Sequence, residues 1–198
     1  MPIPFRDTEE QESLGSAGFL HFLPLAEENA YLGALFLVNA RSEPLEFSYN
    51  RIDLPQRFLW RGADLRRHAV RRLAASLFQI CPRVPGVLLC LAEEVDAELF
   101  TEELQLSVPV ARLAEEAALV GQAAEEEREV LAEERPVQVF WIGGRPPEES
   151  PAYRLVAHLA ARGLLLEPFE RAAMGLREVY RLDEDEGDER LVDGTATF

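Results

Sequence analysis

The chain has 198 residues, 47% of them apolar, which is enough to bury a core without disulfides or a structural metal. Its formal net charge is −16, and all 20 of its Lys and Arg residues are arginine. The lack of lysine excludes Schiff-base chemistry and P-loop phosphate binding, and the acidic charge argues against nucleic-acid binding over the whole surface.

The strands of the N-terminal half are the clearest elements. Residues 1–17 predict a flexible lead, and GFLHFLPL (18–25) predicts a first strand. YLGALFLVN (31–39) is nearly all apolar and predicts a strand covered on both faces, in which Gly33 marks a bulge or a close backbone approach. PLEFSYNRI (44–52) alternates and predicts a half-exposed strand, so short connections make these strands an antiparallel meander.

Helices and short strands are expected to alternate after the meander. A helix over 64–80 begins at Asp64 as N-cap and buries a stripe of residues spaced by four. A buried strand, a short acidic helix and a short strand follow, at 86–92, 96–104 and 108–113. The alanines and glutamates of 113–134 predict a further helix. Then come a strand at 136–144, a helix from Ser150–Pro151 to Gly163 and a last helix through Phe169 and Tyr180.

This order predicts an α/β (or α+β) fold with a mixed sheet, an N-terminal antiparallel meander and flanking helices. We expect a core over 18–113, an extension over 114–181 packed on it and an acidic, disordered tail over 182–198.

The order of elements over 18–113 resembles the ribonuclease-H-like fold. The resemblance implies divalent-metal-binding acids on the first strand, on the first helix and at the end of the fourth strand. Here the first strand carries His21 and no carboxylate before Glu27, and the helix has no acid after Asp64. Only the fourth strand matches, through Glu93 and Glu94, so we expect the nuclease centre to be absent; an unrelated mixed α/β arrangement stays open.

One basic surface stands out in this acidic chain. We define the arginine face, on and just before the 64–80 helix, as Trp60, Arg61, Arg66, Arg67, Arg71 and Arg72. Arg67 and Arg71 are spaced as i,i+4 and share one side of the helix. The face is either solvated and paired with the chain's own glutamates or a site for an acidic partner or a phosphate backbone.

A second candidate is the loop FWIGGRPPEES (140–150), in which a strand, two glycines and a helix start succeed one another. Gly143, Gly144, Arg145 and Ser150 are the residues that would hold an anion there. Glu148 and Glu149 occupy the position of such an anion, which favours a plain strand–loop–helix turn.

No catalytic or metal-binding motif is visible elsewhere. His21, His68 and His158 are scattered, no serine lies in a GxSxG motif, and Cys81 and Cys90 form no CxxC pair. No apolar run reaches the roughly 18 residues of a membrane span, and the acidic N-terminus is no secretory signal. We therefore expect a cytoplasmic protein without cofactor, metal or membrane contact.

The leading interpretation is a non-catalytic accessory subunit that binds a protein partner, within a complex that processes nucleic acid. Direct nucleic-acid binding is expected only through the arginine face. The first alternative is a metal-dependent nuclease or phosphotransfer enzyme whose carboxylates come from Glu46, Asp53, Glu93, Glu94 and Asp96. The second alternative is a small-ligand sensor that uses the loop at 143–151.

Overall fold

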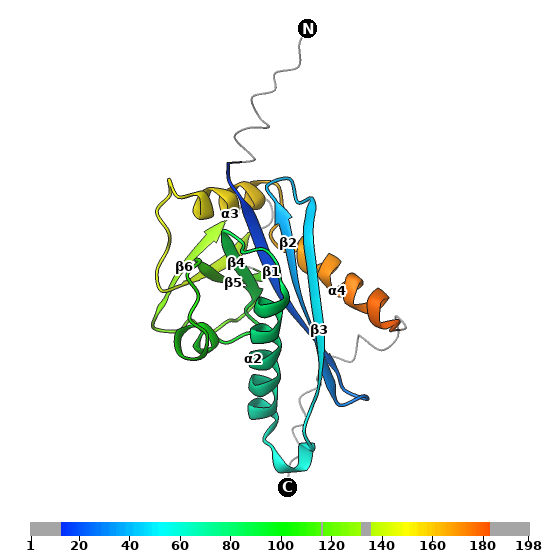
Figure 1. Ribbon diagram of the computed structural model, residues 1–198. Helices are drawn as coiled ribbons and strands as arrows, with labels where there is room; N and C mark the ends of the chain where they lie inside the picture. The colour runs from blue at the N-terminus through cyan, green and yellow to red at the C-terminus, as the bar shows by residue number, and fades with distance from the viewer. Residues whose placement is uncertain (1–12, 116, 132–135, 183–198) are drawn as a thin grey trace.

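The structure is a computed structural model that describes residues 13–115, 117–131 and 136–182 (Figure 1). The expected lead before residue 13 and the acidic tail from residue 183 lie outside these residues. Within the described ranges, no helix combines the length and the apolar character needed to cross a membrane.

A seven-stranded mixed sheet organises the molecule, in the order β3-β2-β1-β4-β5-β7-β6. Its strands are β1 (Ser16–Leu25), β2 (Ala30–Asn39), β3 (Pro44–Asp53), β4 (Val87–Leu91), β5 (Val110–Glu115), β6 (Glu126–Leu131) and β7 (Val137–Ile142). β1 to β3 form an antiparallel meander, β4 and β5 run parallel to β1, and β7 and β6 add antiparallel strands at the far edge. The mixed sheet with its N-terminal meander is confirmed, and its first five strands have the ribonuclease-H-like order.

Helices cover both faces of this sheet (Figure 1). α2 (Gly62–Ile80) packs on β2 and β3. On the opposite face, α3 (Pro151–Ala161) packs on β1 and β6, and α4 (Glu167–Tyr180) packs on β1 and β2. β1 contributes side chains to the apolar clusters on both faces of the sheet, because successive side chains of a strand point to opposite faces. Phe19 belongs to the cluster with α3 and α4, and Leu20 and Phe22 belong to the cluster with α2. Two short helical turns, η1 (Arg57–Leu59) and η2 (Leu99–Glu103), lead into α2 and follow β4.

Two glycines allow these layers to approach closely. A Cβ atom on Gly33 would lie 3.2 Å from Leu77 of α2, so this glycine marks a close approach. The register of the β2–β3 pair shifts elsewhere, at Leu37 and Val38, where Leu45 of β3 is the extra residue. A Cβ atom on Gly175 of α4 would lie 2.7 Å from the Phe47 ring of β3. Both contacts are tighter than a side chain tolerates without movement.

The helix expected over 113–134 is wrong. β5 extends to Glu115, and β6 occupies Glu126–Leu131 as an edge strand beside β7. The spacing of the alanines resembles the apolar face of a helix. In the structure, however, Glu126 is buried against Arg112 of β5, and Gly121 lies in the loop between β5 and β6. A contact between two strands overrode the local helix propensity.

Two smaller expectations also need correction. α2 begins at Gly62, two residues before its expected start, with Arg61 at the N-cap position and no side-chain cap, and Asp64 lies inside the first turn. The acidic helix expected over 96–104 is reduced to the single turn η2.

Candidate functional site

A cavity of about 670 Å³ lies between the N-terminal half of α2 and the segment that follows β4. We call residues 92–98 the acidic loop; this loop follows β4 and leads into η2. It contributes the acids of the cavity wall, which are Glu93, Glu94, Asp96 and Glu98. β1 and β4 are adjacent and parallel; β2, which follows β1, lies on one side of this pair, and β5, which follows β4, lies on the other. Open α/β sheets bind ligands at the carboxyl ends of such a pair, and the cavity occupies this position.

Glu94 is the best-held acid of this wall. Its Oε2 atom accepts a hydrogen bond from the backbone N–H of Phe22 at 3.0 Å, and its Oε1 atom lies 2.7 Å from Nδ1 of His21. Both contacts come from β1, so a residue that lines the cavity is anchored to an inner strand of the sheet. The carboxylate is thereby held in one orientation.

His21 is itself almost completely buried, with 8% of its surface exposed. Its ring packs edge-on against Phe169 of α4, with the ring centroids 6.4 Å apart. Nε2 is buried and has no hydrogen-bond partner among the described residues. His21 is therefore part of the interior, and it acts on the cavity only through Glu94.

Cations face the acids from α2. Arg66 and Arg67 line the cavity, and an Nη2–H of Arg66 donates to the Glu93 carbonyl oxygen. Arg71 and Arg72 line a second, more open hollow on the same helix, where Arg71 lies 3.5 Å from Glu103. The arginine face is thus divided: Arg66 and Arg67 line the cavity, Arg71 and Arg72 line the second hollow, and Arg61 lines neither.

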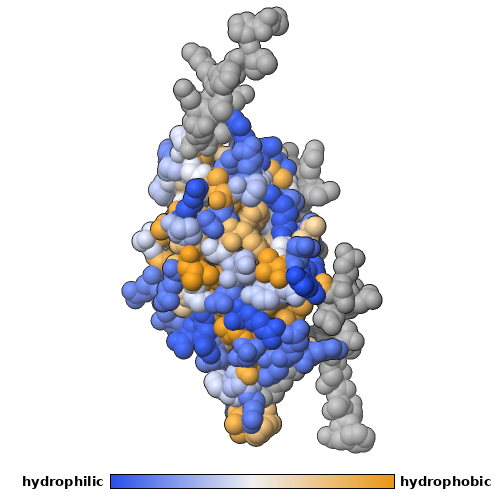
Figure 2. All heavy atoms as spheres, turned by 45° about the vertical axis from the view of Figure 1, so that its right-hand side comes forward, coloured by the Kyte–Doolittle hydropathy of each residue, from blue (hydrophilic) through white to orange (hydrophobic). Residues whose placement is uncertain are grey.

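The rim of the cavity is apolar. Trp60 lines the cavity and packs against the ring of His68, with a centroid distance of 5.2 Å. Beside it in η1, Phe58 and Leu59 are 80% and 71% exposed. Figure 2 shows hydrophobic surface at the lower end of the molecule, where η1 lies in Figure 1.

The five carboxylates considered for a metal centre are divided between two places. Glu93, Glu94 and Asp96 line the cavity, whereas Glu46 and Asp53 belong to β3 and Asp53 pairs with Arg51 at 3.1 Å. No group of three or more His, Cys, Asp or Glu side chains that could hold a metal ion occurs among the described residues. Since β1 presents His21 and α2 presents arginines, the residues do not fit the ligand set that ribonuclease-H-like enzymes use.

The loop at 143–151 is held by its own residues and by carboxylates of β6. Gly143 and Gly144 adopt left-handed φ angles of 77° and 103°, and Ser150 accepts a hydrogen bond from the Tyr153 N–H as the cap of α3. Arg145 pairs with Glu127, Glu129 and Glu148 at 3.7, 3.3 and 3.4 Å. An anionic ligand at this loop would compete with these carboxylates, and the ligand loop stays a prediction.

Sequence reasoning missed the pair Arg112–Glu126, which lies behind the acidic loop. Arg112 is 4% exposed, and its hydrogen bonds reach the acidic loop itself. The available signal was an arginine inside the otherwise apolar run VPVARLA, because a buried cation requires a buried anion.

Comparisons with known proteins agree with the fold. No protein-family model and no curated protein matches the sequence. The structure is similar to the endonuclease V of Streptomyces avermitilis, with 14% identity and a TM-score of 0.56 over 91% of this chain and 94% of that one. It is also similar to the endonuclease V of Bacillus subtilis, with 14% identity and a TM-score of 0.54 over 84% of this chain and 81% of that one.

These similarities correct the leading interpretation of the sequence. A non-catalytic accessory subunit was expected, but the neighbours of almost the whole chain are nucleases, which fits the first alternative better. At 14% identity the likeness establishes the ribonuclease-H-like fold. The chain is an α/β protein of that fold, with a cavity of mixed charge at the end of β4.

Proposed function

We propose that this chain is a nuclease that binds a nucleic-acid strand in the cavity at the end of β4. One observation carries the proposal: a single cavity, at the ligand-binding position of the fold, opposes the cations Arg66 and Arg67 to the acids of the acidic loop. Phosphodiester hydrolysis needs both, since cations bind the phosphate and a carboxylate moves the proton.

Arg66 and Arg67 are the phosphate-binding residues of this proposal. The guanidinium group donates in the fork geometry that phosphate oxygens match. Trp60 at the rim offers a ring on which a base can stack. The net charge of −16 repels nucleic acid from the rest of the surface and confines binding to this one face.

Glu94 is the candidate proton acceptor. Glu94 lines the cavity, one of its carboxylate oxygens accepts a hydrogen bond from the Phe22 N–H, and the other lies 2.7 Å from Nδ1 of His21. In hydrolysis, Glu94 would receive the proton of the attacking water while the arginines balance the charge that develops on the phosphate. The proposed step uses only side chains of this chain, because these side chains do not reproduce the metal ligands of ribonuclease-H-like enzymes.

The test is cleavage and binding of single- and double-stranded DNA and RNA oligonucleotides, each with Mg²⁺, with Mn²⁺ and with EDTA. Glu94→Gln should lower the cleavage rate by about 10²–10⁴-fold, the usual contribution of a general base, while affinity is retained. Arg67→Glu should weaken binding and reduce the slope of log affinity against log salt by about 1.

Arg83→Glu is the matched control, because this exposed arginine follows the opposite end of α2. It carries the same charge reversal and should leave both measurements unchanged. Failure of the wild-type chain to cleave any of these oligonucleotides would overturn the proposal. Equal effects of Arg67→Glu and Arg83→Glu would show that binding follows net charge and not the cavity.

A further inference from the structure

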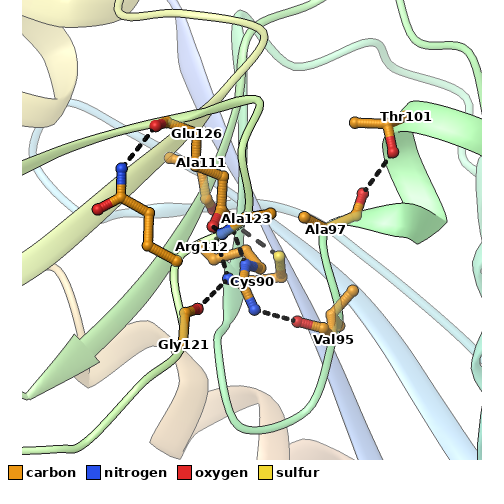
Figure 3. Close-up of polar contacts among 10 residues, drawn as sticks. Cys90, Val95, Ala97, Thr101, Ala111, Arg112, Gly121, Ala123 and Glu126 are labelled. Carbon is orange, nitrogen blue, oxygen red and sulfur yellow. Dashed lines mark hydrogen bonds and ion pairs between the residues drawn. The ribbon is translucent and has the colours of Figure 1, made fainter.

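Arg112 of β5 is a cation sealed inside an acidic protein (Figure 3). Its Nε and Nη2 atoms donate to the two oxygens of Glu126, at 2.6 and 2.8 Å. Burial acts to lower the pKa of Arg112, but the hydrogen bond and charge of Glu126 outweigh it, so the pKa stays above its ordinary value. The guanidinium is therefore permanently charged and firmly oriented.

The remaining donors of Arg112 reach two other segments. Nη1 donates to the Val95 carbonyl oxygen at 3.1 Å, and Nη2 also donates to the Gly121 carbonyl oxygen at 3.0 Å. Glu126 in turn accepts a hydrogen bond from the Ala123 N–H at 2.7 Å. Figure 3 shows the guanidinium group between Val95 on one side and Gly121 and Glu126 on the other.

Val95 is the important neighbour, because it lies between two acids of the cavity wall, Glu94 and Asp96. Val95 is 2% exposed, and its N–H donates back to Leu91 at the end of β4. The acidic loop is thus held by β1 at the Glu94 side chain and by Arg112 at the next backbone carbonyl. Arg66 at the Glu93 carbonyl and the N–H bonds to Leu91 hold the start of the loop, so Arg112 is the anchor at the carbonyl between the two acids.

We propose that Arg112 is a positioning residue: it fixes the acidic loop through the Val95 carbonyl and thereby sets where the cavity carboxylates lie. The effect on the loop follows from the contacts of Arg112 alone. Its consequence for nucleic-acid cleavage rests on the proposed function. A purely stabilising ion pair would contribute to the whole fold and would have no particular effect on this loop.

Arg112→Lys separates the two roles. Lysine keeps the positive charge near Glu126 but lacks the planar fork that reaches Glu126 and Val95 together. The matched control is Arg128→Lys, which makes the same change at an exposed arginine over the same ring, Phe140. Cys90 supplies an internal reporter: it is buried, its Sγ atom contacts the Ala111 carbonyl oxygen next to Arg112, and burial raises the pKa of its thiol well above the usual value.

Amide hydrogen exchange of peptides over 92–98, 121–126 and α2 is the decisive measurement. In Arg112→Lys the amides of 92–98 should exchange at least about tenfold faster while those of α2 keep their protection, as expected of local opening. Thiol labelling of Cys90, in a Cys81→Ser background, should accelerate in parallel. Arg128→Lys should change neither reading.

Unchanged exchange at 92–98, or equal acceleration in all three segments, would overturn the positioning role. If Arg112→Lys does not fold, exchange of the wild-type chain at increasing urea decides instead: the proposal requires 92–98 and 121–126 to open together, below the free energy of global unfolding. In oligonucleotide cleavage, Arg112→Lys should lower kcat more than it raises KM. If the wild-type chain cleaves no oligonucleotide but Arg112→Lys still exchanges faster at 92–98, the proposed function is refuted and the positioning role of Arg112 stands.

Discussion

At the scale of single residues, the contact between His21 and Glu94 separates this site from the metal centres of its fold class. β1 carries the imidazole of His21 and no carboxylate, and Nδ1 of His21 lies 2.7 Å from Oε1 of Glu94. The two residues are 73 positions apart (94 − 21), so no local pattern could reveal their contact. Their types were visible in the sequence, but their meeting depends on the parallel pairing of β1 with β4.

His21→Asp tests this difference directly. Without metal, the new carboxylate faces Glu94, and like charges this close should destabilise the fold by about 1–3 kcal/mol. Mn²⁺ should then restore stability, because two facing carboxylates are ligands for a hard cation. Urea unfolding with and without Mn²⁺ measures both effects.

His21→Asn is the control for that experiment, since it removes the imidazole without adding charge. It should show no response to Mn²⁺. An equal Mn²⁺ stabilisation of the wild-type chain would mean that the cavity already takes a cation.

At the scale of elements, the close packing of a helix on the sheet depends on a glycine at the point of contact. α4 crosses β3 at Gly175, where a Cβ atom would lie 2.7 Å from the Phe47 ring. Glycine lowers helix propensity, and here the loss is offset by the contact that it permits. The position has no substitute that keeps both α4 and Phe47 in place.

Gly175→Ala should therefore have opposite signs in two backgrounds. In the wild-type chain it should destabilise the fold by about 1–3 kcal/mol through overpacking, less the gain in helix propensity. In Phe47→Leu, where the ring is gone, it should be neutral or stabilising by up to about 1 kcal/mol. A double-mutant cycle in urea measures the coupling, and additive effects would show that α4 moves freely over β3.

The elements that could be predicted are those whose signal is local. The apolar run of 31–39 and the Ser150–Pro151 helix start match the structure, because a covered strand and a helix cap depend on adjacent residues. Residues 44–52 do form a strand, but their expected faces are wrong: Ser48 is buried, Tyr49 is 42% exposed, and the register shift beside Leu45 places Leu45 and Phe47 in the apolar clusters of opposite faces. The prediction of a helix over 113–134 failed because Glu126 pairs with Arg112, which lies on the other side of a chain reversal. In the site, Glu93, Glu94 and Asp96 lie together because one loop carries them, whereas Glu46 and Asp53, which were grouped with them, lie on β3, and Arg112 behind the loop was not considered.

At the scale of the whole molecule, charge is the dominant property. A net charge of −16 on 198 residues makes the compact state repel itself at low ionic strength. The ion pairs that oppose this repulsion range from the buried Arg112–Glu126 pair to exposed ones such as Arg145–Glu148. Exposed pairs contribute about 0–1 kcal/mol each and do not cancel the excess of acid.

Raising NaCl should accordingly stabilise the folded chain, because salt screens the repulsion between like charges. The distance beyond which charges are screened falls from about 10 Å at 0.1 M to about 3 Å at 1 M. The urea midpoint should rise between low salt and 1 M NaCl, and chloride is preferred to sulfate, which would also strengthen apolar burial. A midpoint that falls with NaCl would show that favourable pairs outweigh the net charge. Nucleic-acid binding should respond in the opposite direction and weaken with salt.

The packing of α4 on β1 and β2 has a consequence for how the chain is made. β1 leaves the ribosome early, yet one of its faces, which carries Phe19, is covered by Phe169 of α4, the last described element. Until α4 emerges, the nascent meander presents this apolar face to solvent, and its long-range contacts cannot form. The meander therefore cannot complete its packing before α4 has been made, so a translational pause between the meander and α4 would expose this apolar face to chaperones and proteases.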